Sequence, residues 1–170
     1  MNSRTILNFT LHQNASITTD SRKVQAGDLF LAYPGSGTDG RQYIPQAIAR
    51  GAAAVIWEKN EFNWQPEWQV NNASIQSLKQ KVGEIAAEFY GHPSSNLHMV
   101  GVTGTNGKTS VSHWIAQCLT ALGEKTAVLG TIGNGFLDAQ VAAINTTPDA
   151  CLLQAMLADY LQQGAKAVVM

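Results

Sequence analysis

Apolar and polar positions alternate along the chain in blocks that predict short strands separated by helices. Apolar runs at 29–33 and 52–57 have the length of buried strands, and an earlier extended piece begins at Ile17. A short helix is expected over about 43–50, with Gly51 as its C-cap. This β-α-β order predicts a small α/β domain at the front of the chain.

A longer helix and a domain boundary are predicted next. The segment 58–72 is expected to be irregular, and helical spacing of apolar residues then runs over about 74–90. The residues of this stripe are Ile75, Leu78, Val82, Ile85, Ala86 and Phe89. Turn-forming residues at 91–95 end the helix. We therefore divide the chain into a first domain at 1–91 and a second domain at 92–170.

The second domain repeats the alternation of strand and helix. Strands are predicted at 97–103, 126–129 and 167–170, and a helix from Pro148 to about Gln163 is capped by Thr147. An earlier helix carries an apolar stripe of Val111, Ile115, Cys118, Leu119 and Leu122. Strands that alternate with helices predict a parallel sheet, with ligands at the carboxyl ends of its strands.

Composition narrows the class of protein. Hydrophobic residues make up 45% of the chain and charged residues 14%, which is enough apolar material for packed cores. The net charge of −1 argues against a nucleic-acid partner. No signal sequence or membrane span is recognisable, so we expect a cytoplasmic protein without a membrane partner. Cys118 and Cys151 are interpreted as small buried residues in a reducing compartment.

A glycine-spaced turn between a predicted strand and a predicted helix carries the clearest chemistry. Its residues are Gly104, Thr105, Asn106, Gly107, Lys108, Thr109 and Ser110. The two glycines let backbone N–H groups turn toward phosphate oxygens, Lys108 adds a positive charge, and the Thr109 hydroxyl can bind Mg²⁺. The usual pattern G-x-x-x-x-G-K-[ST] would require glycine at position 102, where this chain has valine. The alternative is a glycine-rich connection with an exposed lysine, and the strand-turn-helix order favours a phosphate loop.

Four motifs together resemble the Mur ligase family. They are Asp20-Ser21-Arg22 with Gly27-Asp28-Leu29-Phe30, Asp39-Gly40-Arg41 before a helix that ends at Gly51-Ala52, the phosphate loop at 104–110, and Asn145-Thr146-Thr147-Pro148-Asp149. The loop alone is equally similar to the related folylpolyglutamate synthases. The other three motifs are most similar to members that add the third residue of the cell-wall peptide. The resemblance also accounts for Val102, since the family's loop has this spacing.

The resemblance implies a site in each domain. The first, a small α/β domain, would bind the uridine nucleotide of the substrate at Thr19, Ser21, Ser36, Gly37 and Thr38. The second, the first half of a parallel-sheet ATPase domain of the phosphate-loop type, would bind ATP at 104–110, with Lys108 and Thr109 as catalytic residues. Mg²⁺ would be held by Thr109 and Thr131, and the muramoyl-dipeptide by Asn145, Thr146 and Thr147. Structural alternatives stay open, because Asp20-Ser21-Arg22 and Thr131 suit turns and Thr147 suits a helix cap.

The implied reaction is ATP-dependent amide formation. Phosphorylation of the glutamate carboxylate of UDP-N-acetylmuramoyl-L-alanyl-D-glutamate would give an acyl phosphate, which the amine of diaminopimelate or lysine then attacks. The family's carbamylated lysine and its amino-acid-selecting domain are expected beyond residue 170. We therefore expect a monomeric N-terminal fragment without turnover of its own. Two other classes remain open: a small-molecule kinase or GTPase, and a non-catalytic nucleotide-sugar binding module.

Overall fold

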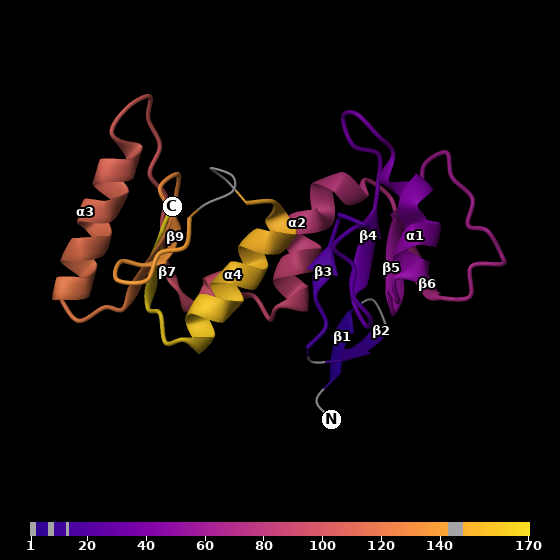
Figure 1. Cartoon of the computed structure of the whole chain (residues 1–170), viewed down its shortest axis with the longest axis horizontal. Helices are drawn as coiled ribbons and strands as arrows, with labels where there is room; N and C mark the ends of the chain where they lie inside the picture. The colour runs from indigo at the N-terminus through magenta and orange to yellow at the C-terminus, as the bar shows by residue number, and fades with distance from the viewer. Residues whose placement is uncertain (1–2, 7–8, 13, 143–147) are drawn as a thin grey trace. The chain divides into compact units, whose positions relative to one another are not determined.

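The computed structural model describes residues 3–6, 9–12, 14–142 and 148–170 of the chain. It divides into two compact units, Met1–Phe89 and Tyr90–Met170. Each unit carries its own mainly parallel four-stranded sheet together with helices, so the predicted α/β class is confirmed (Figure 1). None of the described helices is long and apolar enough to cross a membrane.

The sheet of unit 1 has the strand order β3-β4-β5-β6, and every neighbouring pair is parallel. Its strands are β3 (Ile17–Thr18), β4 (Leu29–Ala32), β5 (Ala54–Glu58) and β6 (Asn71–Ile75). The helices are a 3₁₀ turn η1 (Gly40–Tyr43), α1 (Ile44–Ala49) and α2 (Leu78–Phe89). A separate antiparallel pair is formed by β1 (Ser3–Ile6) and β2 (Phe9–His12).

The two central strands of unit 1 are buried along their whole length, as expected for parallel strands with both faces covered. The strand β3 is aligned with β4 by the buried carboxylate of Asp28. Its Oδ1 accepts a hydrogen bond from the Ser16 amide and its Oδ2 accepts one from the Gln25 amide, each at 2.8 Å. Asp28 therefore fixes the turn that enters β4.

The edge strand β6 corrects the prediction of an irregular segment at 58–72 and of a helix from about 74. Part of the segment expected to be irregular is a strand, and α2 begins at Leu78 rather than near position 74. The carboxylate of Glu58 sets this start, because it accepts hydrogen bonds from the amides of Leu78 at 2.7 Å and Ser77 at 3.2 Å. A side chain from β5 thus satisfies the first free amides of the helix.

The sheet of unit 2 has the strand order β7-β10-β8-β9, in which only the β8–β9 pair is antiparallel. Its strands are β7 (His98–Val100), β8 (Thr126–Leu129), β9 (Asn134–Phe136) and β10 (Ala167–Val169). Its helices are the 3₁₀ turn η2 (Pro93–Asn96), α3 (Lys108–Ala121) and α4 (Ala150–Gln162).

The face of α3 that packs on the sheet overlaps only partly with the predicted stripe, because Ile115 and Leu119 pack against the core as predicted. The buried residues are Ser112 and Ala116, and Ala116 packs with Val128 and Val169 of the sheet. Small side chains let the helix approach the strands closely. Three members of the predicted stripe are exposed as a result: Val111, Cys118 and Leu122. The expectation that Cys118 is buried is therefore wrong, whereas Cys151 is buried as expected.

The predicted N-cap of α4 is also corrected. The helix begins at Ala150, and the Asp149 carboxylate accepts hydrogen bonds from the amides of Cys151 and Leu152, each at 3.0 Å. Asp149 therefore takes the capping role that the sequence assigned to Thr147. Thr147 itself lies outside the described residues.

An ion pair between a buried arginine and a partly exposed aspartate holds the loop that follows β4. The Arg41 side chain is almost fully buried, and its Nε and Nη2 donate to the carboxylate of Asp39. Its Nη1 donates to the backbone carbonyls of Glu58 and Asn60. The hydrogen bond from Arg41 holds the pKa of Asp39 below its usual value. One guanidinium thus ties the loop after β4 to the end of β5.

The chain contains a matched control for the contribution of the Asp39–Arg41 pair to stability. Asp20 and Arg22 have the same sequence spacing, but the Arg22 side chain is 80% exposed. We predict that Arg41→Ala lowers the free energy of unfolding by about 2–3 kcal/mol, because it leaves Asp39 and two carbonyls without their donor. Arg22→Ala should leave it nearly unchanged. Urea unfolding of both variants measures the difference, and equal losses would contradict this account.

Because Glu58 caps α2 with its carboxylate, we predict that the free energy of unfolding depends on pH. Burial alone would raise the pKa of Glu58, but hydrogen bonds from the backbone of Leu78, Asn60 and Ser77 outweigh it and lower the pKa. The stabilisation is therefore present above the unfolded pKa and is lost as the pH falls through the lower folded pKa. Glu58→Gln should cost about 1 kcal/mol at pH 7. Urea titrations at descending pH should show that the gap to the wild type closes below about pH 4, and a constant gap would refute the role of the charge.

Candidate nucleotide-binding sites

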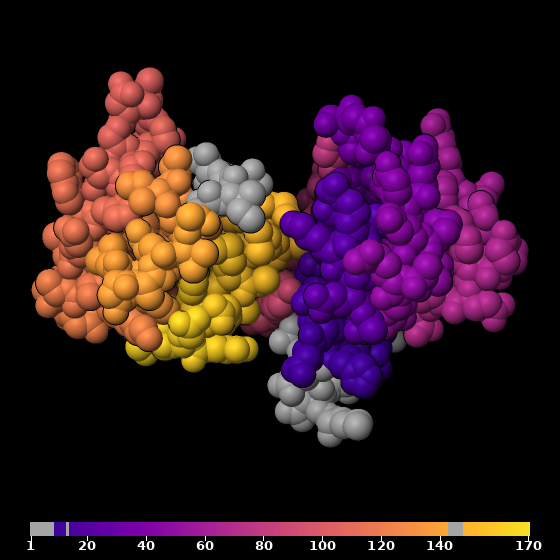
Figure 2. Space-filling model, in the orientation of Figure 1, coloured from indigo at the N-terminus to yellow at the C-terminus, as the bar shows by residue number. Residues whose placement is uncertain are grey.

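The glycine-spaced loop lies between β7 and α3 at the surface of unit 2 (Figure 2). Gly104 has a φ of +151° and Gly107, the N-cap of α3, has a φ of +80°. Side chains rarely adopt such backbone angles, so both positions suit glycine. The 14-residue helix α3 begins directly after the loop, and its positive end is directed at the same place. The backbone has the arrangement that an anion requires.

The ammonium of Lys108 is held within this loop. Its Nζ donates to the backbone carbonyl of Gly104 at 2.6 Å, and the side chain is exposed. Thr105, Asn106 and Ser110 are exposed as well. The loop therefore presents a fixed positive charge to solvent beside its backbone amides.

A small cavity of about 130 Å³ adjoins the loop at the carboxyl ends of the parallel strands. The structure brings Lys108, Thr109 and Thr131 together in its wall. The other lining residues are Val102, Ser112, Leu129, Gly130, Pro148 and Met170. Asn145, Thr146 and Thr147 were expected at this edge, but they lie outside the described residues.

The donor set at this cavity suits a metal ion only together with phosphate. In the described part of the chain, no group of three or more histidine, cysteine or acidic side chains could hold a metal. Thr109 and Thr131 supply neutral hydroxyl oxygens, and Mg²⁺ prefers oxygen ligands and commonly takes several of them from substrate phosphates. The residues present therefore fit a Mg²⁺ that arrives with a nucleotide.

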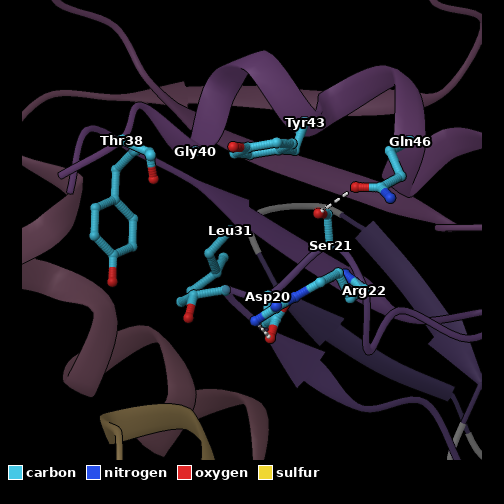
Figure 3. Close-up of a pocket in the computed structure, with 10 residues that line it drawn as sticks. Asp20, Ser21, Arg22, Leu31, Thr38, Gly40, Tyr43 and Gln46 are labelled. Carbon is cyan, nitrogen blue, oxygen red and sulfur yellow. Dashed lines mark hydrogen bonds and ion pairs between the residues drawn. The ribbon is translucent and has the colours of Figure 1, made fainter.

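A second, larger cavity of about 500 Å³ lies in unit 1 (Figure 3). Three residues predicted for the uridine nucleotide line it: Thr19, Ser21 and Thr38. Ser36 and Gly37 lie in the same exposed loop as Thr38 but are not among the residues that line the cavity. The sequence motifs after β3 and β4 thus meet at one site, because the two strands are parallel neighbours.

Polar and charged groups of this cavity are fixed by hydrogen bonds. Arg22 donates to both carboxylate oxygens of Asp20 at 2.9 Å, and this bond lowers the pKa of Asp20. The buried Ser21 hydroxyl donates to Oε1 of Gln46 at 2.7 Å. The cavity therefore has an ion pair on one side and a neutral polar pair on another (Figure 3).

Two lining residues from the helical region were missed by the sequence analysis. Tyr43 ends η1 and Gln46 lies in α1, and both face the cavity. Their spacing of three residues places them on one side of the helical segment, next to the side that carries the buried Ile44 and Ala47. This polar face is the signal that could have found them. Asp20, Arg22, Leu31, Tyr33 and Gly40 complete the wall.

Unit 2 has the strand, glycine-rich loop and helix of the phosphate-loop class of α/β folds. Models of two Mur ligase domains match the chain. The model of the Mur ligase family catalytic domain matches residues 14–90, and that of the Mur ligase middle domain matches residues 102–170. The chain belongs to the Mur ligase family.

Individual relatives agree with this assignment. The chain is 54% identical to the UDP-N-acetylmuramoyl-L-alanyl-D-glutamate–2,6-diaminopimelate ligase of Nitrosomonas europaea and 48% identical to that of Chromobacterium violaceum. These matches cover 91% of this chain but only 30% and 31% of the relatives. The chain thus spans about a third of the length of the curated relatives that it matches.

Solved structures of Mur ligases are also similar to this chain. A UDP-N-acetylmuramoyl-L-alanyl-D-glutamate–2,6-diaminopimelate ligase superimposes with a TM-score of 0.70 at 32% identity, over 91% of this chain and 31% of that one. MurF ligase from Thermotoga maritima in complex with ADP superimposes with a TM-score of 0.59 at 25% identity, again over 91% of this chain and 31% of that one.

The loop geometry predicts that alanine substitutions at Gly107 and Gly101 differ in their effect on the stability of unit 2. Gly107→Ala should lower the stability of unit 2 by about 1 kcal/mol, since alanine is strained at positive φ even where space is open. Gly101→Ala is the control, because Gly101 has no positive φ and open space around it. Hydrogen exchange of the α3 amides measures both effects. Equal protection in the two variants would show that the turn at Gly107 is not constrained.

Proposed function

We propose that this chain is the N-terminal part of an ATP-dependent ligase that adds 2,6-diaminopimelate to UDP-N-acetylmuramoyl-L-alanyl-D-glutamate. The observation that carries the proposal is the 46–54% identity to relatives of that name across about nine-tenths of the chain, through both cavity-bearing units. The reaction would contribute to peptidoglycan synthesis, and hence to cell shape and division, in the cytoplasm. The free thiols of Cys118 and Cys151 are in keeping with a reducing compartment.

Unit 1 would bind the uridine nucleotide of the substrate. Its cavity offers the hydroxyls of Thr19, Ser21 and Thr38 to polar groups of the nucleotide, and the exposed Arg22 offers charge to a diphosphate. Ser36 and Gly37 stay predictions for the loop that leads to Thr38. The contacts of Asn145, Thr146 and Thr147 with the muramoyl-dipeptide also stay predictions.

Unit 2 would bind ATP at the loop from Gly104 to Ser110. The positive-φ glycines and the start of α3 support this assignment, because they present backbone N–H groups to an anion. Lys108 and Thr109 would act in catalysis through their contacts with the phosphates. ADP bound to the related MurF ligase also supports it.

Amide formation requires an activated carboxylate. Transfer of the γ-phosphoryl group to the glutamate carboxylate gives an acyl phosphate, and the amine of the diamino acid then displaces phosphate. Lys108 neutralises charge on the transferred group, and the loop amides hold it in line. A Mg²⁺ held by Thr109 and Thr131 would supply further charge neutralisation at the phosphate oxygens.

Two titrations of this chain test the assignment of the units. We expect UDP-N-acetylmuramoyl-L-alanyl-D-glutamate to bind with the affinity unchanged in Lys108→Ala and reduced about tenfold in Ser21→Ala, since one hydrogen bond is lost. ATP with Mg²⁺ should bind weakly. Calorimetry measures both. A chain that bound ATP but ignored the uridine nucleotide would be a kinase or GTPase instead.

The full-length ligase tests the chemistry. Lys108→Ala should lower kcat by about 10²–10³-fold there, because charge on the transferred phosphoryl group loses its cation, and the Kd of the uridine nucleotide should not change. Steady-state release of ADP with the dipeptide substrate gives kcat. Full activity of Lys108→Ala would contradict the catalytic role of Lys108. A wild type that binds the uridine nucleotide but releases no ADP would favour a non-catalytic nucleotide-sugar binding module.

A further inference from the structure

Ser21 is the most enclosed polar side chain of the unit 1 cavity, at 6% exposure. Its hydroxyl donates its only proton to Oε1 of Gln46 at 2.7 Å. A hydroxyl has one donor and two acceptor lone pairs, so the oxygen of Ser21 is left as an acceptor. The cavity therefore contains a buried acceptor whose direction is set by a neighbouring amide.

An aromatic ring lies beside this pair. Tyr43 is 41% exposed and lines the same cavity, three residues before Gln46 on the same helical segment. Figure 3 shows its ring on the side of the cavity where Ser21 and Gln46 meet. An open aromatic face next to a buried hydrogen-bonding group suits a planar base that stacks and is read at its edge.

We propose that Gln46 is a specificity residue that makes the cavity select uracil over cytosine through Ser21. This inference rests on the proposed binding of a uridine nucleotide in unit 1. With the Ser21 proton engaged by Gln46, the Ser21 oxygen accepts the N3–H of uracil while the base stacks on Tyr43. Cytosine carries a lone pair at N3, so two acceptors would face each other and the buried Ser21 oxygen would stay unpaired. A buried group left unpaired discriminates strongly between similar ligands.

Gln46 acts on the base by holding the hydroxyl in one orientation. Without it, the Ser21 hydroxyl turns freely and donates to the N3 of cytosine as readily as it accepts from uracil. The signature of this role is a change in the ratio of two affinities. A residue that only supported the helix would weaken both nucleotides equally.

The test uses calorimetry on the whole chain with UDP, CDP and 3-methyl-UDP, in which a methyl group replaces the N3 hydrogen. The wild type should bind UDP at least tenfold more tightly than either of the others. Gln46→Leu should reduce the UDP/CDP ratio to threefold or less. Gln46→Glu should keep the ratio while weakening both nucleotides, because a carboxylate still accepts the Ser21 proton but repels the diphosphate. Gln42→Leu is the matched control, since Gln42 is exposed nearby and does not line the cavity.

The outcomes separate this inference from the proposed function. Tight UDP binding with an unchanged UDP/CDP ratio in Gln46→Leu, or with 3-methyl-UDP bound as well as UDP, would overturn the role of Gln46 and leave the proposed function intact. A wild-type chain that binds no UDP would overturn the proposed function of unit 1 and this inference with it. If Gln46→Leu fails to fold, 3-methyl-UDP and Gln46→Glu still decide the matter.

Discussion

The parallel pairing of neighbouring strands is the constraint on which both cavities depend. In unit 1 the chain leaves β3 and β4 at the same edge of the sheet, so the segments that follow these strands meet there. In unit 2 the loop after β7 and the turn after β8 lie at one edge, with β10 between the two strands. Polar residues distant in sequence are gathered because parallel strands have their carboxyl ends together.

Burial decides what the same short motif does. Asp39 with Arg41 and Asp20 with Arg22 have the same spacing and form the same carboxylate–guanidinium pair. The arginine of the first pair is enclosed and also stacks over the ring of Phe62 at 4.8 Å, so it holds loops together. The second pair borders a cavity and leaves its arginine to solvent. One motif is structural, and the other is available to a ligand.

The sequence predicted the buried strands, the glycine turn before α3 and the alternation of strands and helices, because apolar runs and glycines mark them directly. It missed β6, whose residues Asn71–Ile75 are mostly polar, since an edge strand needs pairing partners rather than an apolar pattern. It placed Ile115 and Leu119 of α3 correctly against the core but missed Ser112 and Ala116, which are buried although they are small or polar. Tyr43 and Gln46 escaped notice because only the folded loop after β4 gives them a cavity to face.

The hydrogen bond from Lys108 to the carbonyl of Gly104 changes what nucleotide affinity at this loop means. The ammonium already has an oxygen partner, so an arriving phosphate exchanges one oxygen for another. The free energy measured on binding is then the difference between two contacts, which is smaller than the strength of the contact with phosphate. Weak binding of phosphate alone would thus be compatible with a lysine that stabilises a more highly charged transition state strongly.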